Sequence, residues 1–107
     1  MDIKIQRKIQ ELQMLEQNLQ GISAQKQPLQ STLSEIESSL EEISKTNEDC
    51  FKVVGQIMIK SSKDDIKKEL NEKKSNLSLR INAFEEQEEE INSKLEKLRN
   101  DIAKELK

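Results

Sequence analysis

The sequence has no histidine, no tryptophan and no tyrosine, and its one cysteine is Cys50. Without histidine, the most common general acid–base group and metal ligand is missing. A single cysteine excludes an intrachain disulfide and a paired-thiolate metal site, and it fits a reducing compartment. A glycine-rich phosphate loop is also missing, since the chain has only two glycines. We therefore expect neither an enzyme nor a cofactor or metal site.

Apolar residues are scarce for a chain of this length. They make up 33% of its 107 residues, against 36% charged residues, whereas about 45–50% apolar is usual in a globular domain. We therefore do not expect a large core within one chain. No charged-then-apolar leader opens the sequence and no run of about 18 apolar residues occurs, so we expect a cytoplasmic protein without a membrane partner. The net charge of −3 includes no basic cluster, which argues against nucleic acid as a partner.

Two long stretches carry apolar residues at intervals of three and four, the spacing of a coiled-coil seam. The first stops at Lys45–Asp49, where Thr, Asn and Asp favour local hydrogen bonds over helix. Ser62 with Asp65 resembles a capping box and begins the second. Seam residues pair in antiparallel order at a nearly constant sum of residue numbers, which predicts a helical hairpin. The predicted pairs are Ile43–Ile66, Leu40–Leu70, Leu33–Leu77, Leu19–Ile91, Leu15–Leu95 and Leu12–Leu98.

Residues 50–60, CFKVVGQIMIK, are rich in β-branched and aromatic residues and interrupt the helical pattern. Either Gly55-Gln56 or Val54-Gly55 could form a two-residue turn, and glycine in the first position suits a type II′ hairpin. In both registers apolar residues lie on both faces, and an isolated two-stranded hairpin is marginal in water. Nothing else in the chain is available to cover it, so we predict that it assembles with other subunits. The predicted assembly residues are Phe51, Val53, Val54, Gly55, Ile57, Met58 and Ile59.

The order of long helix, single hairpin and long helix resembles the beta-type subunit of archaeal prefoldin. The matching stretches are ISAQKQPLQ (residues 22–30), FKVVGQIMIK (51–60) and LRINAFEEQEEEI (79–91). The resemblance covers essentially the whole chain. Its specificity comes from the hairpin and its central placement, because any coiled coil shares the composition of the helices. One hairpin per chain fits the beta type, since the alpha-type subunit has two.

The resemblance implies one prefoldin-like domain over residues 1–107, with an all-α dominated fold. A first coiled-coil helix (1–46) and a second (63–106) form an antiparallel pair, and the β-hairpin between them (50–61) oligomerises into a shared β-barrel. The implied assembly is a hexamer of two alpha-type and four beta-type subunits. It acts as an ATP-independent cochaperone, a holdase whose coiled-coil tips clasp non-native proteins and deliver them to a group II chaperonin. The implied partners are therefore alpha-type subunits, other beta copies, unfolded client proteins and the chaperonin.

A polar layer interrupts the first seam. Lys26 occupies a seam position, with Gly21 and Pro28 nearby, and the layering puts it opposite Phe84 and one layer from Glu88. One interpretation is a register pin or flexion point, in which the Lys26 stem packs along Phe84 and its ammonium bonds Glu88. The other interpretation is a tolerated polar layer with no specific role.

The chain ends carry more apolar residues than a two-helix seam can use. One interpretation is an adaptable tip that grips exposed apolar segments of clients. The other is a frayed coiled-coil end, and the resemblance favours the tip. The predicted client-binding residues are Met1, Ile3, Ile5, Ile9, Leu98, Ile102 and Leu106.

Other readings are weaker. The acidic stretch Glu85–Glu90 could suggest a divalent-cation site, but carboxylates on a helix fan around its axis, which favours a solvated face. Cys50 could be a redox thiol, yet it has no activating neighbour in the sequence, which favours a small residue at a β-edge. The main alternative function is a structural coiled-coil tether that oligomerises without binding clients. A helical arm of an enzyme would need a catalytic site on a second polypeptide.

Overall fold

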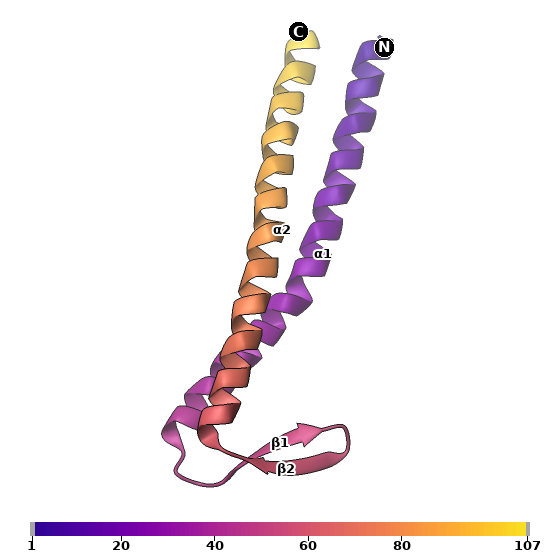
Figure 1. The fold of residues 1–107 in the computed structure, drawn as a ribbon. Coiled ribbons are helices and arrows are strands. Elements are labelled where there is room, and N and C mark those ends of the chain that lie inside the picture. The colour runs from indigo at the N-terminus through magenta and orange to yellow at the C-terminus, as the bar shows by residue number, and fades with distance from the viewer. Residues whose placement is uncertain (1, 107) are drawn as a thin grey trace. The chain divides into compact units, whose positions relative to one another are not determined.

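The computed structural model describes residues 2–106. Helix α1 covers Ile3–Lys45, strand β1 Cys50–Val54, strand β2 Ile57–Ser61 and helix α2 Lys63–Glu105 (Figure 1). The two strands form one antiparallel sheet. Two long helices with one hairpin between them confirm the predicted all-α dominated fold with a central β-hairpin, whereas the shared β-barrel stays a prediction. No helix among the described residues is both long and apolar enough to cross a bilayer.

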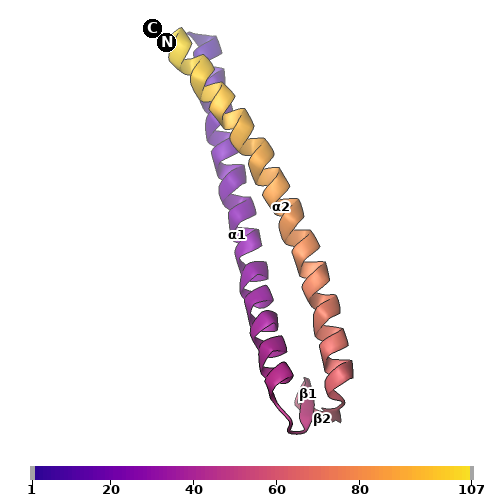
Figure 2. The same ribbon diagram turned by 90° about the vertical axis from the view of Figure 1, so that its left-hand side faces the viewer.

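The chain divides into two compact units, each built from segments of both helices. Unit 1 combines the residues up to Pro28 with those from Ile81 onward, and unit 2 is Leu29–Arg80 with the hairpin. In unit 1 the start of α1 lies beside the end of α2 in both ribbon views (Figures 1 and 2), and an ion pair joins Lys8 to Glu105. The helices of this unit are therefore antiparallel, as predicted.

The core is thin and entirely apolar. Among the described residues, no polar or charged side chain is buried. The buried side chains are Ile5, Ile81, Leu95 and Leu98 in unit 1 and Ile36 in unit 2. Two helices in contact can bury only one stripe of each, so a small core is what this architecture allows.

Side-chain oxygens cap the start of both helices. The backbone N–H of Lys4 donates to Asp2 Oδ1 at 3.2 Å, and that of Asp65 donates to Ser62 Oγ at 3.1 Å. Each bond satisfies an N–H that has no partner within its helix. Asp64 and Asp65 in the first turn of α2 also suit the positive end of its dipole. The helix start predicted at Ser62 is confirmed.

Helix α1 runs through its only proline without a break. Pro28 lies inside the helix, although a proline has no N–H to donate to the carbonyl four residues earlier, here Ala24. Gly21 lies one turn before Ala24, and there is open space where its Cβ would be. Its lack of a side chain therefore serves no close packing in this chain.

Candidate assembly hairpin and helix tip

The hairpin turns at Gly55-Gln56. Val54 pairs with Ile57 across the turn, which decides between the two registers that the sequence allowed. Gly55 has a φ of 62°, whereas no other residue among those described has a positive φ. A positive φ at only the first turn position is the pattern of a type II′ turn, and glycine adopts it without strain.

The hairpin exposes apolar side chains on both faces. Cross-strand pairing puts Phe51, Val53 and Met58 on one face, and it puts Val54, Ile57 and Ile59 on the other. All six are exposed, from 50% to 67% of their surface. The prediction that the chain leaves this hairpin uncovered is confirmed. Its unpaired strand edges and two apolar faces are suited to contact with other chains.

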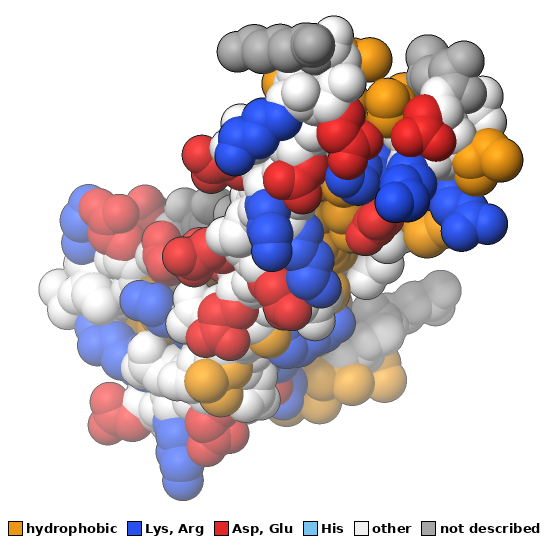
Figure 3. Space-filling view, turned by 90° about the horizontal axis from the view of Figure 1, so that it is seen from above, with side chains coloured by type: hydrophobic (Ala, Val, Ile, Leu, Met, Phe, Trp, Pro, Cys, Tyr) orange, Lys and Arg blue, Asp and Glu red, His pale blue; other side chains and the backbone are white. Residues whose placement is uncertain are grey.

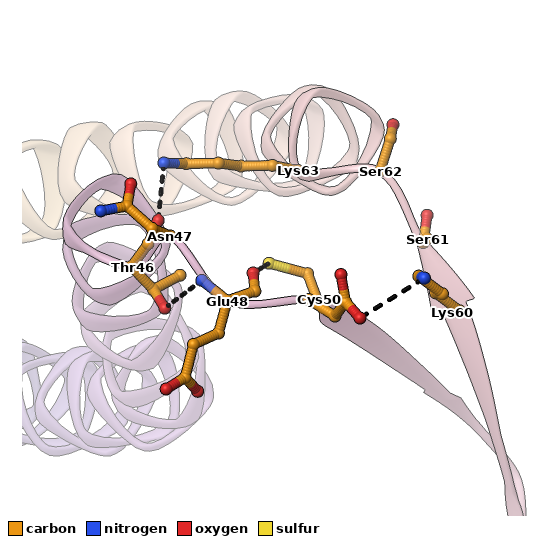
Figure 4. A pocket seen from close by; sticks show the side chains of 9 residues that line it. Thr46, Asn47, Glu48, Cys50, Lys60, Ser61, Ser62 and Lys63 are labelled. Atoms are coloured by element: carbon orange, nitrogen blue, oxygen red, sulfur yellow. Dashed lines mark hydrogen bonds and ion pairs between the residues drawn. The ribbon is translucent and has the colours of Figure 1, made fainter.

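Polar contacts link the chain segments around an open pocket at the base of the hairpin (Figure 4). The Lys63 ammonium donates to the Thr46 carbonyl at 3.0 Å, and the Thr46 hydroxyl accepts from the Glu48 N–H at 3.2 Å. A cation at the last carbonyls of α1 suits the negative end of its dipole. Lys60 lies 3.4 Å from Asp49, and Cys50 Sγ lies 3.8 Å from the Glu48 carbonyl. Cys50 thus serves as a small strand residue at this junction.

Lys26 and Glu88 form a hydrogen bond in unit 1, as one of the two interpretations of the polar layer expects. Lys26 Nζ lies 2.6 Å from Glu88 Oε1, and the Ser23 hydroxyl donates to Glu88 Oε2 at 3.0 Å. The side chains of Lys26 and Glu88 are only 19% and 16% exposed. The hydrogen bond from Lys26, aided by the one from Ser23, holds the pKa of Glu88 below its usual range, although burial opposes this effect. Sequence reasoning missed Ser23, whose position one turn before Lys26 was the available signal.

The acidic stretch of α2 forms an open surface beside this pair. A shallow depression of about 420 Å³ is lined by Lys26, Glu88 and neighbouring polar residues of α2. Within residues 2–106, no three or more acidic, cysteine or histidine side chains are placed to hold a metal ion. Elsewhere on the surface, in the view from above (Figure 3), cationic and anionic side chains are also interspersed. This stretch therefore has the geometry of a solvated helix face.

The predicted tip residues that the structure describes fall into three groups by their exposure. Ile5 and Leu98 are buried, Ile9 and Ile102 are half-buried, and Met1 lies outside the described residues. Ile3 and Leu106 are exposed, and so is Met14, which sequence reasoning missed; the three are 61–65% exposed. Met14 lies eleven residues from Ile3, about three turns at 3.6 residues per turn, so both are on one face of α1. We call Ile3, Met14 and Leu106 the exposed tip residues.

The comparison with known families decides the identity. The family model described as prefoldin subunit matches residues 6–107. The chain belongs to the prefoldin subunit family. Prefoldin subunits are components of a chaperone, not enzymes.

Within the prefoldin family, this chain is similar to beta subunits of archaea. A prefoldin subunit beta of Methanococcus vannielii is 38% identical over 59 residues, which are 55% of this chain and 52% of that protein. A prefoldin subunit beta of Thermococcus kodakarensis is 44% identical over 48 residues, which are 45% of this chain and 41% of that protein. The chain thus spans about half the length of the curated relatives it matches. The resemblance to the archaeal beta-type subunit is confirmed.

Solved prefoldin structures agree over more of the chain. The crystal structure of the prefoldin beta subunit from Thermococcus strain KS-1 superposes with a TM-score of 0.94 at 34% identity, over 99% of this chain and 95% of that one. The beta2 subunit from the same strain shares the fold, with a TM-score of 0.73 at 20% identity, over 81% of this chain and 95% of that one. The prefoldin fold therefore includes the helices and the hairpin alike.

Proposed function

We propose that this chain is a subunit of a hetero-oligomeric, ATP-independent holdase. Hairpins of several subunits join into a shared β-barrel. Alpha-type subunits and other beta copies complete the assembly. The helix ends bind non-native proteins. The assembly acts in the cytoplasm and delivers its clients to a group II chaperonin. The observation that supports this most directly is the hairpin with two exposed apolar faces, in a chain of the prefoldin family.

Assembly follows from the energetics of the hairpin. Burying one large aliphatic or aromatic side chain is worth about 1.5–3 kcal/mol. Six such side chains are exposed on a ten-residue stretch of strands, five residues in each. A sheet on other chains that covers both faces and pairs with both outer edges stabilises the hairpin, whose apolar side chains stay at least half exposed among the described residues.

Client binding is assigned first to the exposed tip residues. They present apolar surface in unit 1 without any rearrangement, whereas Ile5 and Leu98 are buried and become available only if the helices separate. A methionine side chain is flexible and polarizable, so Met14 adapts to varied partners. One such contact is weak, but several tips that act on one client bind with much higher avidity.

One experiment separates this function from that of a tether. The chain is co-expressed with an alpha-type subunit, its native mass is measured, and the complex is mixed with a denaturant-unfolded client. We expect a hetero-oligomer that suppresses client aggregation at a stoichiometric concentration without nucleotide. Assembly without suppression would indicate the tether, and failure to assemble would contradict the proposal.

A further inference from the structure

An ion pair joins the hairpin to the helix that follows it. Lys52 Nζ lies 2.8 Å from Glu69 Oε2, and Lys73 Nζ lies 3.6 Å from Glu69 Oε1. The hydrogen bond from Lys52, together with the charge of Lys73, holds the pKa of Glu69 below its usual range, although burial opposes this effect. One carboxylate of α2 thus faces two cations, and one of them comes from β1.

Apolar packing leaves room between the hairpin and the helices of unit 2. A cavity of about 260 Å³ lies there, lined by Ile43, Phe51, Val53, Ile66 and Leu70 around the ion pair. Phe51 and Val53 remain mostly exposed and do not close this space. Close packing would fix the direction of the hairpin, but an open cavity leaves it free to tilt.

The other polar contacts near the hairpin lie at its base. Lys63 bonds the Thr46 carbonyl, and Lys60 pairs with Asp49 just before β1. Among the ion pairs and hydrogen bonds described for residues 2–106, the pair of Lys52 and Glu69 links a strand to α2 about two turns from the start of that helix. A second attachment away from the base restricts rotation of the hairpin about that base.

We propose that Lys52 and Glu69 form a positioning pair that sets the direction in which the hairpin leaves the helices, and so presents it to neighbouring subunits. The inference rests on the proposed assembly function. A hairpin that already points toward its partner loses less freedom on binding, and this lowers the cost of association. The two side chains are 43% and 37% exposed, and an exposed ion pair is weak. We therefore expect the pair to change the assembly equilibrium by about two- to fivefold.

Charge reversal tests the pair through assembly. K52E, E69K and the swap K52E/E69K are titrated with an alpha-type subunit, and the concentration for half-assembly is read by native mass spectrometry. Each single variant should raise it about two- to fivefold relative to wild type. The swap should bring the concentration for half-assembly only part of the way back to the wild-type value, because Lys73 lies beside the lysine introduced by E69K. High salt should reduce the difference. E41K, which disrupts an exposed pair with Lys45 in the same unit, is the matched control and should have no effect.

A distance measurement tests the same pair without assembly. Spin labels on Q56C and S75C report the direction of the hairpin relative to α2. Cys50 is replaced by serine, and the labelled chain is diluted in unlabelled chain. The distance distribution should broaden in K52E and narrow again in the swap. Equal distributions in all variants, or single variants that assemble like E41K, would overturn the inference. Failure of the wild type to assemble would instead contradict the proposed function, and the distances would still decide the role of the pair.

Discussion

Replacing Lys26 with leucine should destabilise the chain, although leucine is the better residue for a coiled-coil seam. The change removes the 2.6 Å bond to Glu88 and leaves that carboxylate with only the Ser23 hydroxyl among the described contacts. A hydrogen bond to a charged group is worth about 1.5–3 kcal/mol when buried, and an exposed ion pair about 0.2–1 kcal/mol. With side chains 16–19% exposed, this pair lies between those limits. We expect K26L to lose about 1–2 kcal/mol, or roughly 4–10 °C in Tm.

A double-mutant cycle isolates the contribution of the pair. K26L, E88L and K26L/E88L are compared by urea unfolding followed by circular dichroism. Each single variant leaves one partly buried charge without its main partner, whereas the double variant builds an ordinary leucine layer. The double variant should therefore be at least as stable as the wild type. If K26L alone is as stable as the wild type, the pair does not stabilise the fold and the tolerated polar layer is the correct interpretation.

Acid should weaken the same contact. The pKa of Glu88 is lowered in the folded chain, so the unfolded chain takes up a proton at Glu88 more readily. The contribution of the Lys26–Glu88 pair to the free energy of unfolding is complete above the pKa of Glu88 in the unfolded chain, about 4.3. It is lost as the pH falls through the lower pKa of the folded chain. The stability of E88Q relative to wild type should therefore improve below about pH 4.3. A difference that stays constant across this range would contradict the argument.

Three further predictions concern the hairpin, the tip and Gly21. Aspartate at both Val53 and Ile57 should leave the helices formed by circular dichroism but abolish the hetero-oligomer by native mass, because charges buried without partners cost several kcal/mol each; an unchanged mass would exclude the hairpin as the assembly element. Serine at all three exposed tip residues should preserve assembly and reduce aggregation suppression, whereas L79S, at an exposed leucine of unit 2, should not; equal loss in both would contradict the assignment to the tip. G21A should raise stability by about 0.5–1 kcal/mol in urea unfolding, since a methyl group meets open space there, and a lower stability would indicate a role for the flexible backbone.

Much of the fold is predictable because its signals are local. The heptad spacing defines the helices, Ser62 marks a helix start, and Gly55 marks the turn, each through the geometry of a few neighbouring residues. The bond from Lys26 to Glu88 was also predictable, since antiparallel pairing of the seams brings the two close together.

The candidate site was predictable only in part. Ile5 lies one heptad before Leu12, and that spacing predicts a place in the seam, where the structure buries it. Met14 lies outside the seam, so its exposure follows from the same periodicity. The contact between Lys52 and Glu69 had no sequence signal, because it depends on the direction in which the hairpin leaves the helices.

The distribution of apolar residues connects the fold to its proposed use. Two helices of 43 residues each contain all five buried apolar side chains of the described chain, whereas two strands of five residues leave six large ones exposed. A chain selected for stability as a monomer would place such side chains between its helices and not on exposed strands. If the hairpin assembles as proposed, a large part of the available hydrophobic stabilisation is released only between chains. In that proposed assembly the helices can keep a sparse core and an apolar end, because contacts between subunits supply stability that the helices lack.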